Sequence, residues 1–333
     1  MYIGIIGSTG SVGEELIKLL EKNHLNFNIT NIKLFASEKS AGKNIIINNK
    51  DYIIEVLKED SFVNLDVAIF CASSSISKKY APIAIKSNCK VIDNSSAYRM
   101  DKNVPLIIPE INGNLVKKDT FLIANPNCCT ALLCVVIGCL HKKYQIKRLV
   151  ISTYQSASGA GKDGLNELES QLLDYNSEKK YKTDVFGRQY LNNIFSHNTP
   201  IDLETGYNQE ELKIIEETNK ILNSKIRIST TCIRVPVFRS HCESVNIEFG
   251  KEVDLIEIRN LLQNQEGVQV VDDCLNGIFP EPINSQNKFD VQVGRIRFDI
   301  GDETKKTINL FLSGDQLLKG AALNAYQILK LIL

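Results

Sequence analysis

The stretch YIGIIGSTGSVGEELIKLLEKN, residues 2–23, decides the expected fold because it links an apolar run to an amphipathic segment through a glycine-rich loop. Residues 2–7 are typical of a buried strand, and apolar side chains recur at helical spacing over residues 11–23. The glycines between them permit a tight turn, and the new helix offers free N–H groups and its positive dipole end to a diphosphate. A strand, this loop and a helix in succession predict a dinucleotide-binding site rather than an ordinary turn.

The rest of the first half alternates strand-like and helix-like segments. Strands are expected over residues 32–37, 66–73, 89–95 and 120–126, with a helix over 77–87. This alternation predicts an α/β fold with a mostly parallel, doubly wound sheet of the Rossmann type. Ligands of such sheets collect at the carboxyl ends of the strands. The segments NSSAYR (94–99) and NPNCC (125–129) both follow strands, so we expect them to face the same crevice as the glycine loop.

The end of the second strand bears on which dinucleotide is bound. An NAD site places a carboxylate there for the ribose 2′-hydroxyl. This chain has Ser37, Glu38, Lys39 and Ser40. Two hydroxyls and an ammonium suit a 2′-phosphate, so the sequence favours NADP, although Glu38 favours NAD unless it points outward. A surface turn without a cofactor role is the alternative.

Length and composition exclude several classes of protein. A chain of 333 residues exceeds what one core usually covers, so two domains are expected. Acidic and basic residues balance at 39 each, which gives no basic excess for nucleic acid or an anionic membrane. The longest apolar run, residues 131–140, is shorter than the ~20 residues of a membrane span. The charged cluster at residues 177–182 is expected to be a solvated loop.

The nine cysteines are expected to be reduced thiols in a cytoplasmic protein, because the N-terminus has no export signal. No C-x-x-C pair is present, so no metal site is expected.

Two adjacent cysteines, Cys128 and Cys129, follow the helix-start signal Asn-Pro-Asn at residues 125–127. A thiol in the first turn of a helix has a lowered pKa and can act as a nucleophile. Consecutive helical side chains point about 100° apart, so only one of the two thiols can address a given substrate. Two buried thiols that merely pack are the alternative.

Two later segments carry further polar candidates. STYQSASGAGKDG (152–164) leaves a strand through Gln155 into a loop of small residues. A helix over residues 209–222 places Glu210 and Lys213 on one face, where a surface ion pair is the default interpretation.

A third segment, residues 230–249, contains two β-like runs around a turn with Arg234 and His241. Structural or exposed positions are expected for His24, His141 and His197, and a structural role is the default for Arg239.

Taken together, these segments resemble the aspartate-β-semialdehyde dehydrogenases. Eight of them occur in the family's order and approximate spacing: GSTGSVG (7–13), SSAYR (95–99), VPLIIPEIN (104–112), NPNC (125–128), TYQSASGAG (153–161), EELK (210–213), RVPVFRSH (234–241) and KGAALNA (319–325). The resemblance covers nearly the whole chain. Its most specific elements are NPNC and the R-x6-H pattern of Arg234 and His241.

The resemblance implies an NADP-dependent, phosphorylating aldehyde dehydrogenase of lysine, threonine, methionine and diaminopimelate biosynthesis. Such an enzyme reduces L-aspartyl-4-phosphate to L-aspartate-4-semialdehyde and phosphate through a cysteine thioester. The family also implies a Rossmann domain, residues 1–127 completed by a C-terminal helix at 315–333. An α+β catalytic and dimerisation domain is implied for residues 128–314, with a homodimer or homotetramer as the assembly.

Residue by residue, the resemblance makes Cys128 the nucleophile and leaves Cys129 as a packing neighbour. His241 becomes the general acid/base, and Gln155 orients the substrate or stabilises the oxyanion. The substrate-binding residues implied are Arg234 for the carboxylate, Glu210 for the ammonium, Arg99 and Lys213 for the phosphate, and Asn127 for the oxyanion. The cofactor contacts implied are Gly7, Ser8, Thr9, Gly10, Ser11, Val12, Gly13, Ser37, Lys39, Ser40, Ser158, Gly159 and Asn324.

The chain departs from the family pattern at three places. Residues 71–77 are serine-rich where a glycine pair is expected, Gln316 replaces the usual Asn, and Lys39 replaces a common Arg. These departures concern cofactor affinity rather than the reacting groups.

Two other functions remain open at this point. The sister enzyme N-acetyl-γ-glutamyl-phosphate reductase shares the cofactor domain and the thioester, but its acylated substrate amine needs no partner such as Glu210. A non-catalytic dinucleotide-binding paralogue would typically lack the nucleophile or the base, and Cys128 and His241 are both present.

Overall fold

The computed structural model describes residues 1–175, 177 and 180–332. The chain forms two compact units, Met1–Asn127 with Ala321–Leu333, and Cys128–Gly320. The boundary expected between residues 314 and 315 therefore lies later in the chain. The reason is that residues after Gly314 still bind within the second unit. Asp315 accepts a 2.7 Å ion-paired hydrogen bond from Arg239, and Gln316 accepts one of 2.8 Å from the Ser240 N–H.

The first unit is built on a seven-stranded sheet with the strand order β3-β4-β2-β1-β5-β6-β7. Five strands were anticipated and run parallel: β1 (Tyr2–Ile6), β2 (Asn31–Ala36), β5 (Val67–Phe70), β6 (Lys90–Asp93) and β7 (Leu122–Ala124). The antiparallel hairpin of β3 (Asn44–Ile47) and β4 (Lys50–Val56) was not anticipated. The doubly wound fold class is confirmed.

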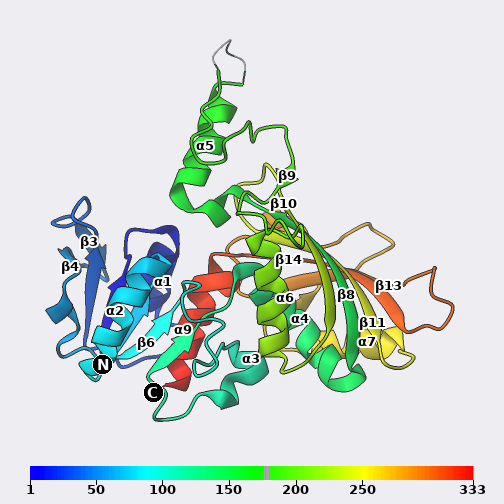
Figure 1. Ribbon diagram of the computed structural model, residues 1–333, viewed down its shortest axis with the longest axis horizontal. Coiled ribbons are helices and arrows are strands. Elements are labelled where there is room, and N and C mark those ends of the chain that lie inside the picture. The colour runs from blue at the N-terminus through cyan, green and yellow to red at the C-terminus, as the bar shows by residue number, and fades with distance from the viewer. Residues whose placement is uncertain (176, 178–179, 333) are drawn as a thin grey trace. The chain divides into compact units, whose positions relative to one another are not determined.

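The helices of the first unit are α1 (Ser11–Lys22), α2 (Ser74–Lys86), α3 (Pro109–Asn112) and α9 (Leu323–Leu331), with 3-10 turns η1 (Glu59–Phe62) and η2 (Gly113–Leu115). Helix α1 buries Leu16, Leu19 and Leu20 and ends at Asn23, which has a left-handed backbone. Helix α9 packs against α1 and β6, as the red helix of Figure 1 shows. The continuous helix expected over residues 315–333 is wrong: a π-helical turn, η4 (Leu318–Ala322), precedes α9, and Leu333 lies outside the described residues.

The second unit contains a mixed seven-stranded sheet with the order β12-β13-β14-β11-β8-β10-β9. The strands are β8 (Ile146–Gln155), β9 (Phe195–Ser196), β10 (Arg227–Arg234), β11 (His241–Phe249), β12 (Val268–Val270), β13 (Val291–Phe298) and β14 (Thr307–Gly314). Strand β8 pairs parallel with β10 on one side and antiparallel with β11 on the other. The predicted α+β architecture is therefore confirmed.

The helices of this unit are α4 (Cys128–Tyr144), α5 (Gly161–Leu173), α6 (Gln209–Ile221), α7 (Leu255–Gln263) and α8 (Pro282–Ser285), with the 3-10 turn η3 (Ala157–Ala160). Helix α4 is apolar on nearly all sides because the sheet, α6 and α7 surround it. Helix α6 begins with a capping box between Asn208 and Glu211. Helix α5 stands apart from the sheet (Figure 1), over a small aromatic cluster of its own.

No helix in the described part of the chain combines the length and apolar character that a bilayer crossing requires. The charged cluster expected to be a loop at residues 177–182 falls partly on residues 178 and 179, outside the described residues.

Candidate active site

Cys128 is the first residue of α4, where the helix dipole and unpaired N–H groups favour a negative charge. Its side chain is partly exposed, whereas Cys129 is fully buried. The close fit around Cys128 is visible at Gly320, where an added Cβ would lie 2.9 Å from the Cys128 Cβ. Of the two thiols, Cys128 is thus the one that a small molecule can reach.

The pKa of the Cys128 thiol is held well below its usual value. The largest cause is a hydrogen bond from the Cys129 thiol, which lowers the pKa. Burial comes next and raises it, and the charge and hydrogen bond of His241 lower it further. The pKa of Cys129 is raised, first by burial and then by its hydrogen bond with Cys128. Cys129 was expected only to pack. The structure makes it the donor that stabilises its neighbour's thiolate.

The sheet brings three predicted residues to one edge. Gln155 ends β8 and Arg234 ends the parallel neighbour β10, and the two residues pair in register. Strand β11 runs antiparallel to β8 with Cys242 opposite Tyr154, so His241 begins β11 where β8 ends. Gly159 keeps this corner open, because a Cβ there would lie 2.9 Å from Arg234 Nη1 and 3.0 Å from His241 Nε2.

The His241 ring is fully buried and held from one side. The Ser156 N–H donates to Nδ1 over 3.0 Å, and Ser156 Oγ lies 3.1 Å from the same nitrogen. Because a backbone N–H can only donate, the neutral ring carries its hydrogen on Nε2. A ring nitrogen of His241 and the sulfurs of Cys128 and Cys129 lie within 4.8 Å of one another. That donor set does not suit a cation while Nδ1 accepts the Ser156 N–H, since the other ring nitrogen is then protonated.

A buried polar network links Gln155, Glu210 and Lys213. Gln155 accepts from Thr153 Oγ1 over 3.1 Å and donates to Glu210 Oε1 over 3.2 Å. The other oxygen of Glu210 pairs with Lys213 Nζ at 3.2 Å, so the ion pair is present but is not the surface pair that was expected. The Glu210 side chain is buried, while Lys213 is partly exposed. Burial of the carboxylate costs solvation that its hydrogen-bond and ion-pair partners must offset, which is typical of a polar ligand site rather than of a surface pair.

Arg234 is buried beside this network. Its Nη1 donates to the Ser156 carbonyl over 3.1 Å, and the guanidinium lies 5.8 Å from the Phe186 ring centroid. Its Nε is buried and has no hydrogen-bond partner among the described residues. An unused donor on a buried guanidinium is the feature that a carboxylate ligand would satisfy.

His197, expected to be structural or exposed, is buried. Its N–H donates to the Cys232 carbonyl over 2.8 Å, and its ring contacts Thr199. Burial is the main cause that lowers the His197 pKa to about 3, with a further contribution from Arg234. The ring is therefore neutral near neutral pH, which agrees with a structural role.

Glu243 is a buried group that the sequence did not single out. It lies two residues after His241 on β11, is fully buried, and neither carboxyl oxygen has a hydrogen-bond partner among the described residues. Burial and the charge of Cys128 raise its pKa well above the usual value, which favours the protonated form. Its spacing of two from His241 on a strand was the available signal.

In the first unit, the glycine loop has the geometry that a diphosphate needs. Gly7 has φ of 84°, and a Cβ on Gly13 would lie 2.3 Å from the Gly7 carbonyl oxygen, so both positions require glycine. Gly10 caps α1 without a side-chain hydrogen bond. The Ser11 hydroxyl is buried and has no partner among the described residues. An open helix N-terminus with an unused donor fits an anionic ligand.

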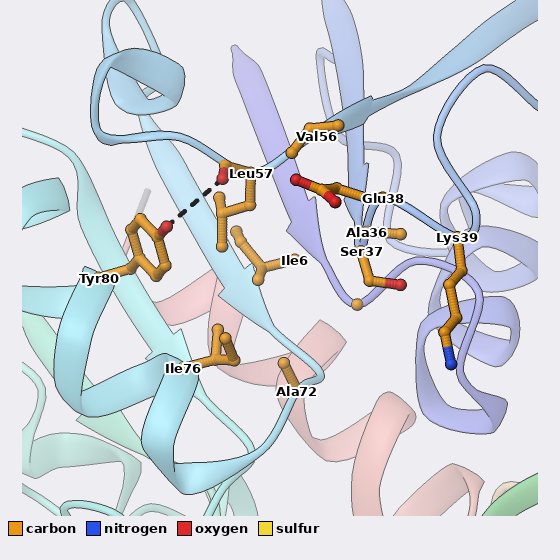
Figure 2. A pocket seen from close by; sticks show the side chains of 11 residues that line it. Ile6, Ala36, Ser37, Glu38, Lys39, Val56, Leu57, Ala72, Ile76 and Tyr80 are labelled. Atoms are coloured by element: carbon orange, nitrogen blue, oxygen red, sulfur yellow. Dashed lines mark hydrogen bonds between the residues drawn. The ribbon is translucent and has the colours of Figure 1, made fainter.

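A cavity of about 650 Å³ lies beside this loop (Figure 2). Ser37, Glu38 and Lys39 form its polar rim, and Ile6, Val56, Leu57, Ala72, Ile76 and Tyr80 line it with apolar atoms. Figure 2 shows the Glu38 carboxylate turned toward Val56 and Leu57, whereas the Lys39 ammonium extends away from them. Glu38 is thus part of the lining. Ser40, half-buried, closes the turn by donating its N–H to the Ser37 carbonyl over 2.9 Å.

The remaining predicted residues of the first unit are engaged in its own structure. Arg99 donates to the carbonyls of Asn125 and Asn94 over 2.9 and 2.8 Å. Asn324 is fully buried and donates to the Ile107 carbonyl and to Asn125 Oδ1 over 2.9 and 2.6 Å. These bonds position the Asn-Pro-Asn segment that precedes Cys128. The ligand contacts expected of Arg99, Asn127 and Asn324 stay predictions.

Comparison with known proteins decides the family. Residues 2–119 match the family described as semialdehyde dehydrogenase, NAD binding domain, and residues 137–319 match semialdehyde dehydrogenase, dimerisation domain. The chain belongs to the semialdehyde dehydrogenase family. The resemblance read from the sequence is therefore confirmed, as are a dinucleotide-binding Rossmann domain, a dimerisation domain and membership of the oxidoreductases.

Individual relatives match over their full length. The aspartate-semialdehyde dehydrogenase of Prochlorococcus marinus is 42% identical over 100% of this chain and 96% of its own. That of Aquifex aeolicus is 41% identical over 99% of this chain and 97% of its own. Among solved structures, aspartate semialdehyde dehydrogenase II from Vibrio cholerae is 34% identical, with a TM-score of 0.94 over 99% of this chain and 98% of that one. The same Vibrio cholerae enzyme has been solved complexed with ASA.

Proposed function

We propose that the protein is an NADPH-dependent aspartate-semialdehyde dehydrogenase. It reduces L-aspartyl-4-phosphate to L-aspartate-4-semialdehyde and phosphate, on the route to lysine, threonine, methionine and diaminopimelate. The observation that carries the proposal is the Cys128 thiol at a helix N-terminus beside a buried histidine, in surroundings that lower its pKa. The names of the full-length relatives support the choice of substrate.

The first chemical step is acyl transfer to Cys128. The thiolate attacks the β-carbonyl carbon of the acyl phosphate, the C–O bond to phosphate breaks, and inorganic phosphate leaves with the bonding pair. A thioester on Cys128 remains. Asn127 and the Gln155 amide are the donors proposed for the oxyanion that forms during the attack.

The second step reduces the thioester. NADPH, when bound, supplies a hydride for the thioester carbonyl carbon. The imidazolium form of His241 then gives its Nε2 proton to the oxygen during formation of the thiohemiacetal, which leaves the neutral ring with hydrogen on Nδ1, and takes the proton back as the C–S bond breaks. The semialdehyde leaves, and the Cys128 thiolate is restored.

Several polar side chains have complementary proposed roles toward the substrate. The unused Nε of Arg234 suits the α-carboxylate, and the buried carboxylate of Glu210 suits the ammonium. Lys213 and Arg99 are proposed to hold the phosphate. The free ammonium that Glu210 would bind distinguishes this substrate from N-acetyl-γ-glutamyl phosphate, whose amine is acylated.

NADP is the proposed cofactor. The glycine loop from Gly7 to Gly13 would hold the diphosphate, and Ser37, Lys39 and Ser40 the 2′-phosphate. Ser158, Gly159 and Asn324 are proposed as further contacts. Glu38 lines the same cavity and is the one group there that favours a free 2′-hydroxyl.

The catalytic unit is proposed to assemble as a homodimer or homotetramer, since residues 137–319 match a dimerisation domain. Neither a nucleic acid nor a membrane is proposed as a partner, because acidic and basic residues balance at 39 each.

The test is phosphate-dependent reduction of NADP by the purified protein with L-aspartate-4-semialdehyde, followed by absorbance of the reduced cofactor. The proposal predicts a signal that requires phosphate, is lost in Cys128→Ser and survives in Cys129→Ser. Dinucleotide binding without any signal would contradict it. Turnover of the N-acetyl-γ-glutamyl substrate would then favour the sister enzyme, and no turnover of either the non-catalytic paralogue.

A further inference from the structure

Ser156 is a buried residue without an assigned role, and it presents two groups to the same nitrogen of His241. Its N–H donates to Nδ1 over 3.0 Å, and its hydroxyl oxygen lies 3.1 Å from Nδ1. The N–H can only donate, whereas the hydroxyl can either donate or accept. Both Ser156 and His241 are fully buried, so water does not compete at this nitrogen.

The hydroxyl belongs to a chain of buried hydrogen bonds. Ser158 Oγ lies 3.1 Å from Ser156 Oγ, and Gln316 Nε2 donates to Ser158 Oγ. The orientation of the Gln316 amide is set by the Ser240 N–H, which donates to Gln316 Oε1 over 2.8 Å. Gln316 is also the residue at which the chain departs from the usual Asn. This series of hydrogen bonds offers Ser158 Oγ as an acceptor for the Ser156 hydroxyl hydrogen when that hydrogen turns away from the His241 ring.

Proton exchange at Nε2 of His241 requires such an acceptor at Nδ1. A ring that gives or takes a proton at Nε2 alternates between the imidazolium and the neutral form with hydrogen on Nδ1. Both forms carry a hydrogen on Nδ1, and the Ser156 N–H cannot accept it. The Ser156 hydroxyl is the acceptor next to Nδ1 that the structure provides.

We propose that Ser156 is the positioning residue for His241: its N–H holds the neutral resting ring with hydrogen on Nε2, and its hydroxyl accepts the Nδ1 hydrogen once the ring has taken up a second proton from solvent and exchanges protons at Nε2. Its role resembles that of the carboxylate in a catalytic triad, with a neutral hydroxyl in place of the charge. The inference rests on the proposed function, in which His241 is the acid/base.

Several titratable or charged groups lie near the ring or near Cys128 beside it. They are Cys128 and Cys129 from α4, Arg234 from β10, Glu210 from α6, Glu243 from β11 and His197 after β9. None of these residues is substituted in Ser156→Ala, so a change in His241 protonation in that variant is assigned to the missing hydroxyl.

The experiment compares Ser156→Ala, which keeps the N–H, with Ser156→Thr, which keeps a hydroxyl. Ser240→Ala is the matched control, because Ser240 is buried, precedes His241 and has an Oγ without a partner among the described residues. The ¹⁵N spectrum of histidine-labelled protein is followed against pH, and His241 among the four histidines is assigned with His241→Asn. This measurement needs no substrate, so it stays informative if the proposed function fails.

In Ser156→Ala, the pH at which His241 gains its second proton should fall by about one unit. The value of kcat should fall about 10- to 100-fold with a smaller change in KM, since a general acid/base contributes about that much or more. Ser156→Thr should restore most of both, and Ser240→Ala should leave both near the wild type. An unshifted titration in folded Ser156→Ala, or a resting wild-type ring with its hydrogen on Nδ1, would overturn the proposal. A normal titration shift without wild-type turnover of the semialdehyde would instead count against the proposed function.

Discussion

Replacement of Cys129 by alanine tests how the Cys128 thiolate is stabilised. Among the groups that lower the pKa of Cys128, the Cys129 thiol makes the largest contribution, ahead of His241. A hydrogen bond to a charged group contributes roughly 1.5–3 kcal/mol, and a weak S–H donor about 1 kcal/mol. One pKa unit corresponds to about 1.4 kcal/mol, so Cys129→Ala should raise the pKa of Cys128 by about 0.7 unit. The sign follows because the donor stabilises only the ionised form.

The assay is the pH dependence of iodoacetamide alkylation at Cys128, read by mass spectrometry of the peptide that contains it. Cys129→Ser keeps a hydroxyl donor and should shift the profile less. Cys134→Ala removes another buried thiol of α4 and should leave the profile in place. If the profile of Cys129→Ala coincides with the wild type or moves to lower pH, the hydrogen bond does not stabilise the thiolate and the reasoning is refuted.

Three further predictions concern neighbouring features. Burial raises the Glu243 pKa, so the folded protein keeps a proton that the unfolded chain releases, and the free energy of unfolding falls as pH rises above the pKa of the unfolded chain. Glu243→Gln should therefore raise Tm more at about pH 8 than at about pH 4. Equal changes in Tm at both pH values would contradict a neutral carboxyl. An added Cβ at Gly320 would lie 2.9 Å from the Cβ of Cys128 and would displace the nucleophile. Gly320→Ala should therefore lower kcat about tenfold while the circular dichroism spectrum stays native. Full activity would mean that the contact relaxes at little cost. At the cavity rim, Glu38→Ala should raise the ratio of kcat/KM for NADP to kcat/KM for NAD about tenfold, and Lys39→Ala should lower it about tenfold. Shifts in the opposite directions would reverse the roles of the two residues.

Local signals were enough to place the nucleophile and the cofactor loop. Asn-Pro-Asn before an apolar run predicted the start of α4, and the helix begins at Cys128. The three glycines at Gly7, Gly10 and Gly13 predicted a strand-to-helix loop, because only glycine tolerates the backbone of Gly7 and the contact at Gly13. Such features depend on residues that are close in sequence.

The features that were missed depend on distant residues or on turn chemistry. The hairpin of β3 and β4 turns at Asn48 and Asn49, both with positive φ, a signal that was present but not used. The bond between Ser156 and His241 joins residues 85 apart, so no sequence spacing indicates it. The later start of α9 follows from bonds of Asp315 and Gln316 to residues on the turn before β11, which a helical pattern alone does not report.

The central claim, that Cys128 carries the acyl group, is tested most directly by mass spectrometry of the peptides of the digested protein. The protein is incubated with L-aspartate-4-semialdehyde and NADP in the absence of phosphate, quenched in acid and digested. We predict an added aspartyl group on Cys128 that disappears when phosphate is supplied before the quench and is absent in Cys128→Ser. An adduct on another residue would contradict the account, and so would turnover by Cys128→Ser, which forms no adduct.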